Sequence, residues 1–216
     1  MKKILLTTIF SVFYIASASA EIGVNIGLSG NAGVFTASAN ERLAGTGNLD
    51  EGSEHGEAGW TSVFIEKTLG PVLLVGIDYV PDGLESETAE TAKVDKGPDA
   101  ITSTIVTNTI KVAFEDLTTY YISKTLGDGG MYGLLGMHTA TIASKTTLPN
   151  ATYGSDDITG VQYGLGYAFD NGLRYEVSFS DFEDIELKDS TNVDTTGVSK
   201  ITADLDVYMM KVSYHF

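Results

Sequence analysis

The residues of this chain that could carry chemistry are three histidines and a set of carboxylates in its polar segments. His55, His138 and His215 lie far apart and do not recur at the spacing of a metal site. Gly27-Leu28-Ser29-Gly30-Asn31 misses the G-x-S-x-G nucleophile pattern by one residue, and no phosphate-binding loop occurs. The absence of cysteine excludes a thiolate metal site and a cysteine nucleophile. We therefore expect no enzymatic activity, no cofactor and no metal, with His55 beside a loop Ser and Asp as the remote alternative.

The acidic residues gather in segments that we predict to be loops. The first such segment holds five acids and one arginine, and the second holds six acids and two lysines. Clustered carboxylates can bind Ca²⁺, and the candidates are Asp95, Asp99, Asp156 and Asp157. A solvated, repulsive outer surface explains the same residues, and we prefer it. The formal net charge of −16 excludes a nucleic-acid binder, which needs a basic surface to displace counterions.

The segments that must position these residues alternate apolar with polar or small side chains. In 161–169 one face reads Val, Tyr, Leu, Tyr, Phe and the other reads Gln, Gly, Gly, Ala. A second alternating segment, 173–180, follows directly after Asp170-Asn171-Gly172. A period of two indicates β-strands whose two faces see different environments. The Asn-Gly pair tolerates the positive φ of a type I′ turn, so we predict a hairpin here.

The same pattern predicts eight strands joined alternately by tight turns and long loops. The strands are expected near 22–40, 58–68, 72–80, 110–126, 131–143, 160–169, 173–186 and 203–216. The tight turns are expected at 68–71, 126–130 and 170–172, and the long loops at 41–57, 81–109, 144–159 and 187–202. This asymmetry is typical of an outer-membrane barrel. The predicted fold class is all-β, an eight-stranded antiparallel transmembrane up-and-down β-barrel. We treat 101–114 as an overhang of the fourth strand, and ten strands remain possible.

A soluble β-sandwich is the alternative fold, because its strands alternate as well. Its inner face should favour Val, Ile and Leu, whereas the apolar face here is rich in tyrosine near the strand ends. These tyrosines are Tyr79, Tyr120, Tyr163, Tyr167, Tyr175, Tyr208 and Tyr214. Tyrosine at the rims of an apolar band is what a lipid headgroup interface selects. The pattern therefore favours the barrel.

The first twenty residues have the pattern of a secretory signal peptide. Lys2 and Lys3 precede an apolar run over 4–15, and Ala18-Ser19-Ala20 supplies a small-x-small cleavage site. A transmembrane anchor is the competing interpretation, but the run is short for a hydrocarbon core of about 30 Å. We expect cleavage of residues 1–20 and one barrel domain over 21–216.

The last strand ends the chain on an aromatic residue. Its outward face is entirely apolar or aromatic, and comprises Tyr208, Met210, Val212, Tyr214 and Phe216. In this feature the sequence resembles small bacterial outer-membrane β-barrels of the outer-membrane protein X, outer-membrane protein A and opacity-protein kind. The resemblance implies a Gram-negative outer membrane, contact with lipid and lipopolysaccharide, and a terminal strand that the barrel assembly machinery reads as its signal. Such proteins include adhesins, anchors and minor channels.

Charged residues on the opposite strand faces are expected to fill the barrel. This lumen charge cluster comprises Glu66, Asp78, Glu115, Arg174, Glu176 and Lys211. Each cation should lie near a carboxylate, since a desolvated charge without a partner is costly, and a cluster of Arg174, Glu176 and Lys211 is geometrically plausible. Leu165 should face lipid and Gly164 the lumen.

An eight-stranded barrel has room for little besides its own side chains. We therefore expect a non-enzymatic envelope anchor or surface-loop interaction protein, with an extracellular ligand at the loops left open. A narrow porin-like channel for small solutes or ions is the alternative.

Overall fold

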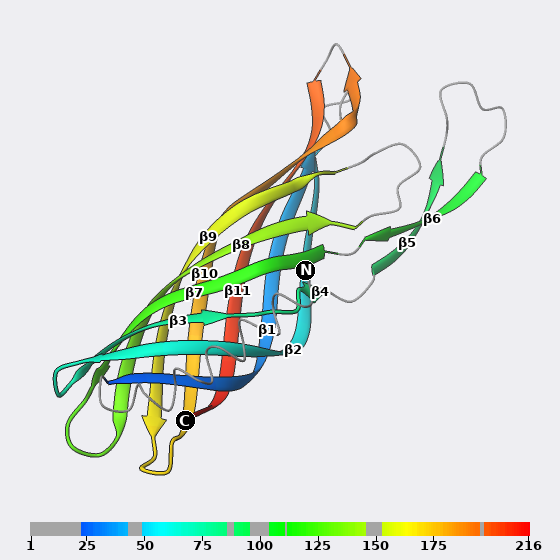
Figure 1. Cartoon of the computed structure of the whole chain (residues 1–216). Coiled ribbons are helices and arrows are strands. Elements are labelled where there is room, and N and C mark those ends of the chain that lie inside the picture. The colour runs from blue at the N-terminus through cyan, green and yellow to red at the C-terminus, as the bar shows by residue number, and fades with distance from the viewer. Residues whose placement is uncertain are drawn as a thin grey trace, which may run out of the picture.

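The computed structural model describes residues 23–42, 49–85, 89–95, 104–110, 112–145, 153–194 and 197–216. The predicted signal peptide, 1–20, lies outside these ranges. Within them the regular elements are all β-strands, shown in Figure 1. No helix in the described ranges is long and apolar enough to cross a membrane.

Eight strands form a closed barrel. They are β1 (Val24–Arg42), β2 (Leu49–Leu69), β3 (Leu73–Tyr79), β7 (Val112–Thr125), β8 (Met131–Ser144), β9 (Ser155–Ala168), β10 (Leu173–Asp194) and β11 (Gly197–His215). Each is antiparallel to its neighbours in the order β3-β2-β1-β11-β10-β9-β8-β7, and pairing of β3 with β7 closes the sheet. The predicted eight-stranded up-and-down barrel is therefore confirmed.

Three short strands lie at the end of the barrel away from the tight turns. β4 (Leu84–Glu85) pairs with β7 and extends the wall by two residues. β5 (Ala89–Asp95) and β6 (Thr104–Ile110) pair with each other as a separate two-stranded sheet. Figure 1 shows this hairpin leaning away from the barrel.

The tight turn between β9 and β10 differs in detail from the predicted type I′ turn. Gly172 has a φ of 88°, but Asn171 is not among the residues with positive φ. The Gly172 N–H donates to the Phe169 carbonyl at 3.1 Å, and the Asn171 side chain accepts the Leu173 N–H at 3.1 Å. An i to i+3 bond followed by a left-handed glycine is the longer hairpin connection that combines a type I turn with a bulge.

Two of the predicted long loops are largely strand. β1 and β2 pair from the turns as far as Arg42 opposite Leu49, and β10 and β11 pair as far as Asp194 opposite Gly197. In Figure 1 the β10–β11 pair rises well beyond the rest of the barrel. The sequences of both pairs lack the apolar alternation of a membrane strand here because this part has no lipid-facing side. A polar segment without alternation predicts a loop, which is why the sequence pattern misses these strands.

The outer surface of the barrel carries an apolar belt. Its members are exposed although they are large and hydrophobic, and include Leu28, Ile77, Tyr120, Ile122, Leu135, Met137, Val161, Tyr163, Leu165, Tyr175, Val177, Tyr208, Met210, Val212 and Phe216. In β11 and the residue after it the belt runs over 208–216, which at the usual rise and tilt of barrel strands covers roughly 20 Å along the axis. Leu165 is 54% exposed and the inner face carries Gly164, as predicted.

The interior changes character along the barrel axis. Near the tight turns it is filled by charged and hydroxyl side chains, whereas the opposite half holds an apolar core. That core comprises Val80, Leu84, Phe114, Ala140, Ile142, Tyr153, Ile158, Phe182, Ile185, Leu187, Leu205 and Val207, with Phe35, Trp60 and Leu117 packed against it. The charged layer therefore lies beneath an apolar cap.

Candidate functional site

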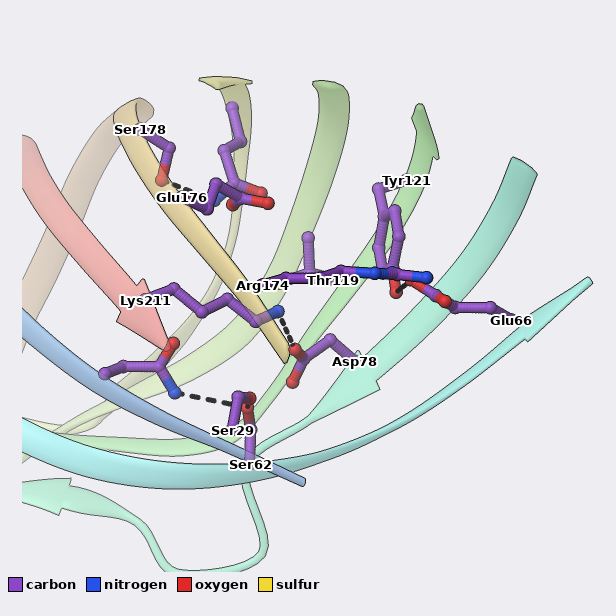
Figure 2. Close-up of polar contacts among 12 residues, drawn as sticks. Ser29, Ser62, Glu66, Asp78, Thr119, Tyr121, Arg174, Glu176, Ser178 and Lys211 are labelled. Carbon is purple, nitrogen blue, oxygen red and sulfur yellow. Dashed lines mark hydrogen bonds and ion pairs between the residues drawn. The ribbon is translucent and has the colours of Figure 1, made fainter. Parts of the chain in front are cut away.

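The charged layer is built from inward positions of strands that lie on different sides of the barrel. Glu66 comes from β2, Asp78 from β3, Arg174 and Glu176 from β10, and Lys211 from β11. All five side chains point into the lumen, as Figure 2 shows. We call this group the lumen plug.

The first ion pair of the plug joins Lys211 to Asp78. The ammonium group donates to the Asp78 carboxylate, and both side chains are about one-tenth exposed. The same ammonium lies 5.5 Å from the ring centre of Phe64 and 5.7 Å from that of Tyr121. Aromatic faces attract cations, and more strongly where water is excluded. Lys211 is therefore held by one carboxylate and two rings.

The second ion pair joins Arg174 to Glu66. The Arg174 Nη1 lies 2.5 Å from Glu66 Oε1, and the Tyr121 hydroxyl donates to the same oxygen at 2.8 Å. In Figure 2 the Arg174 side chain extends across the lumen from its strand to reach Glu66. Charge-assisted hydrogen bonds of this kind are about twice as strong as neutral ones.

Glu176 completes the plug without forming an ion pair. It lies opposite Lys211 in the strand register, yet the Lys211 ammonium bonds Asp78 instead. Glu176 Oε2 accepts a hydrogen bond from the Tyr132 hydroxyl at 3.1 Å. The predicted cluster of Arg174, Glu176 and Lys211 is therefore split, with each cation paired to a carboxylate of β2 or β3.

Three inward glycines make room for the aromatic rings of the plug. A Cβ atom on Gly76 would lie 2.4 Å from the Tyr121 ring, and one on Gly166 would lie 2.3 Å from the Tyr132 ring. Each glycine is the direct cross-strand partner of its aromatic residue. Gly27 holds Phe64 in the same way. The rings therefore lie flat on the neighbouring backbone. Sequence reasoning missed this feature, although an inward glycine paired with an inward aromatic residue on the next strand indicates it.

A neutral polar layer separates the plug from the apolar core. His138 Nδ1 lies 2.8 Å from Thr119 Oγ1, its Nε2 lies 2.8 Å from Ser180 Oγ, and its ring stacks on Phe182. A serine hydroxyl on a histidine nitrogen has the geometry of a nucleophile and base. Ser180 is only 1% exposed, however, and the third partner is a threonine rather than a carboxylate. The layer therefore fits a structural role.

The structure does not bring the three histidines together. His55 pairs with Thr36 far from the tight turns, His138 lies in the middle of the lumen, and His215 pairs with Gly27 near the turns. His55 is exposed and belongs to β2 rather than to a loop.

Glu115 does not belong to the lumen plug, and the prediction that it points inward was wrong. Asp116 has a φ of 56°, and the register of β7 with β8 shifts between Glu115 and Thr118. This bulge reverses the parity, so Glu115 is exposed and lies 3.8 Å from the ammonium of Lys145. That ammonium also donates to Glu85 at 2.8 Å, a hydrogen bond that raises the pKa of Lys145.

The aspartates considered for Ca²⁺ are used in strand contacts where they can be described. Asp156 accepts the backbone N–H of Glu186 at 3.2 Å, and Asp157 accepts the Thr141 hydroxyl at 2.8 Å. The side chains of Asp95 and Asp99 lie outside the described part of the chain. Among the described residues, no three histidine or acidic side chains are grouped to hold a metal ion.

The free space inside the barrel is small. A cavity of about 40 Å³ lies between the plug and the apolar core, lined by Asn31, Trp60, Asp78, His138 and Phe182 among others. A second cavity of about 10 Å³ lies inside the plug. Spaces of this size have room for only a few water molecules.

Known proteins similar to this chain are found among solved structures. No family model matches the chain, and no curated protein matches its sequence. Among solved structures, the outer membrane protein OprG from Pseudomonas aeruginosa is 12% identical with a TM-score of 0.49, covering 89% of this chain and 97% of its own. Neisserial surface protein A is 11% identical with a TM-score of 0.41, covering 87% and 97%. AlkL is 12% identical with a TM-score of 0.44, covering 88% and 90%.

The closed sheet, the apolar belt and the tight turns gathered at one end decide the class. The chain is an eight-stranded outer-membrane β-barrel. In such barrels the short turns face the periplasm and the longer connections face outward. The plug of this barrel therefore fills the periplasmic half of the lumen, and the apolar core fills the extracellular half.

Proposed function

We propose that this barrel is a non-enzymatic, non-conducting envelope protein that anchors in the outer membrane and presents its extended strands to the surroundings. The observation that carries the proposal is the lumen plug. Lys211–Asp78 and Arg174–Glu66 both cross the lumen, and the cavities beside them hold only a few waters.

An ion passing through the barrel would have to separate these pairs. Removing one partner from a buried pair leaves an uncompensated charge and costs about 3–5 kcal/mol. Above the plug the ion would also meet the apolar core, whose described members carry no charge that could replace its hydration. Both layers oppose the alternative of a narrow porin-like channel.

The extracellular part offers a surface instead. The β1–β2 and β10–β11 pairs continue beyond the belt, and present exposed side chains such as His55, Glu57 and Glu183. We place an extracellular ligand there, lipid and lipopolysaccharide around the belt, and the barrel assembly machinery at the β11 face that ends in Phe216.

Planar-bilayer recording tests the proposal. The wild-type barrel should show no step conductance, and the double variant Asp78→Ala/Lys211→Ala should stay closed as well, because the Arg174–Glu66 pair and the apolar core still fill the lumen. Lys188→Ala is the matched control, since Lys188 is an exposed cation whose ion pair with Glu186 lies on the outer surface and outside the plug. Steps of porin size from the wild-type barrel would refute the proposal and favour the channel.

A further inference from the structure

The barrel wall is incomplete on one side of its extracellular half. β2 pairs with β1 from Leu49 to Lys67, but on its other side it pairs with β3 only from Val63 to Leu69. Over 49–62 no other strand of the described chain lies against this second side of β2. The backbone N–H and C=O groups on that side form a free edge, which begins just above Tyr79, where the belt ends.

The gap has a local cause. The chain leaves β3 through Val80 and Pro81, and proline has no N–H to donate to a ladder. The next strand, β4, pairs with β7 and not with β2. The third strand of the barrel is therefore interrupted on the side that faces β2.

The β5–β6 hairpin continues the register of the interrupted strand, although it leans away from the barrel in Figure 1. Leu84 of β4 is opposite Phe114 of β7, and Ala89 of β5 is opposite Ile110 of β6. From the first pair to the second, the chain moves five residues forward, from 84 to 89, while its partner moves four residues back, from 114 to 110. β3, β4 and β5 form one interrupted strand, and β6 with β7 forms the strand beside it. β5 consequently follows β3 on the side of the wall next to β2.

Among the described strands, two edges are thus left without a neighbour: the 49–62 part of β2 and the side of β5 away from β6. Proteins usually protect a long edge with charged side chains, proline, bulges or a covering segment. The segment 49–62 carries four acids and three glycines, but no proline, lysine or arginine. An isolated two-stranded hairpin is also marginally stable in water. Pairing β5 with β2 would satisfy both edges.

We propose that the β5–β6 hairpin is a flap whose β5 strand pairs with the free edge of β2 and completes the extracellular wall. Continuing the register past Val63 opposite Tyr79 brings Ser53 opposite Ala89 and Leu49 opposite Lys93. The lengths of the two edges therefore match. Closure of the flap covers the side of the apolar core beside Trp60. This inference goes beyond the proposed function, because it does not depend on the lumen plug.

Disulfide trapping tests the flap in the full-length barrel, which has no cysteine of its own. Ser53→Cys is combined in turn with Ala89→Cys and with Thr91→Cys, and the barrel is oxidised in native membranes. An intramolecular disulfide is expected in at least one pair. Ser53→Cys with Ile110→Cys is the matched control, because Ile110 lies one strand farther away, beyond the reach of about 7 Å between Cα atoms.

Fluorescence gives a second measurement, since Trp60 is the sole tryptophan. Cross-linking should lower acrylamide quenching of Trp60, and reduction should restore it. Disulfides between two chains would show that the edge pairs with a second copy, and would overturn the flap. Equal trapping at Ile110, no trapping at Ala89 or Thr91, or unchanged quenching after trapping would overturn it as well. Folded barrels are recognised by their heat-modifiable migration in gels, and disulfide formation is measured on these folded molecules alone.

Discussion

Lys211 and Asp78 form an ion pair across the lumen although 133 residues separate them in the sequence. β1 and β2 lie between their strands in the wall, so the two side chains meet through the interior and not along the sheet. The pair therefore requires the sheet to curve around the lumen, so that the third strand of the barrel and the last strand face each other.

Arg174→Ala should lower the free energy of unfolding by about 3–5 kcal/mol, because Glu66 would keep a buried charge without its cation. Adding Glu66→Gln should restore part of the loss. Urea unfolding in lipid vesicles measures both, with Lys188→Ala as an exposed control that changes stability by less than about 1 kcal/mol. A loss for Arg174→Ala as small as that of the control would show that water solvates the pair.

Gly76→Ala should destabilise the barrel by about 1–3 kcal/mol, the range for overfilling a packed interior. The new methyl group would lie 2.4 Å from the Tyr121 ring and displace the hydroxyl that bonds Glu66. Gly30→Ala is the control, since a Cβ there meets nothing within 4 Å. Equal unfolding free energies for the two variants would contradict the role given to Gly76.

Leu165→Arg should cost about 2–4 kcal/mol, because Leu165 is the central member of the exposed apolar row over 161–169 and faces the hydrocarbon core. Thr159→Arg, on the same face of β9 but above the belt, should cost about 0–1 kcal/mol. Unfolding in vesicles measures the difference. A cost at Thr159 equal to that at Leu165 would mean that the belt is misplaced.

Deletion of Phe216 should impair assembly in cells and leave a protease-sensitive periplasmic species. The residue ends the outward face of the last strand, and its N–H donates to the Ile26 carbonyl at 2.9 Å. Phe216→Tyr keeps the ring and the backbone bond, and should assemble normally. Heat-modifiable migration of membrane fractions distinguishes the two. Normal assembly of the deletion variant would remove Phe216 from the assembly signal.

Local pattern was enough to predict the elements of the fold. Strands, tight turns and lipid-facing positions depend on side chains two residues apart and on single turn residues, so 161–169, Gly172 and Leu165 could be assigned without knowing their neighbours. The same reasoning fails in the parts of the strands that lie beyond the lipid, where apolar and polar side chains no longer alternate. The sequence pattern predicts loops for the extracellular parts of β2 and β10, because a strand with water on both sides needs no row of apolar side chains.

The partners of the buried charges were decided by the tertiary structure. The inward direction of Arg174 and Lys211 follows from parity, but their pairing with Glu66 and Asp78 depends on which strands face each other once β3 meets β7. Glu115 shows the same limit, because the bulge at Asp116 reverses its parity. A period of two fixes the face of a side chain only while the ladder is regular, and closure of the barrel determines what that face meets.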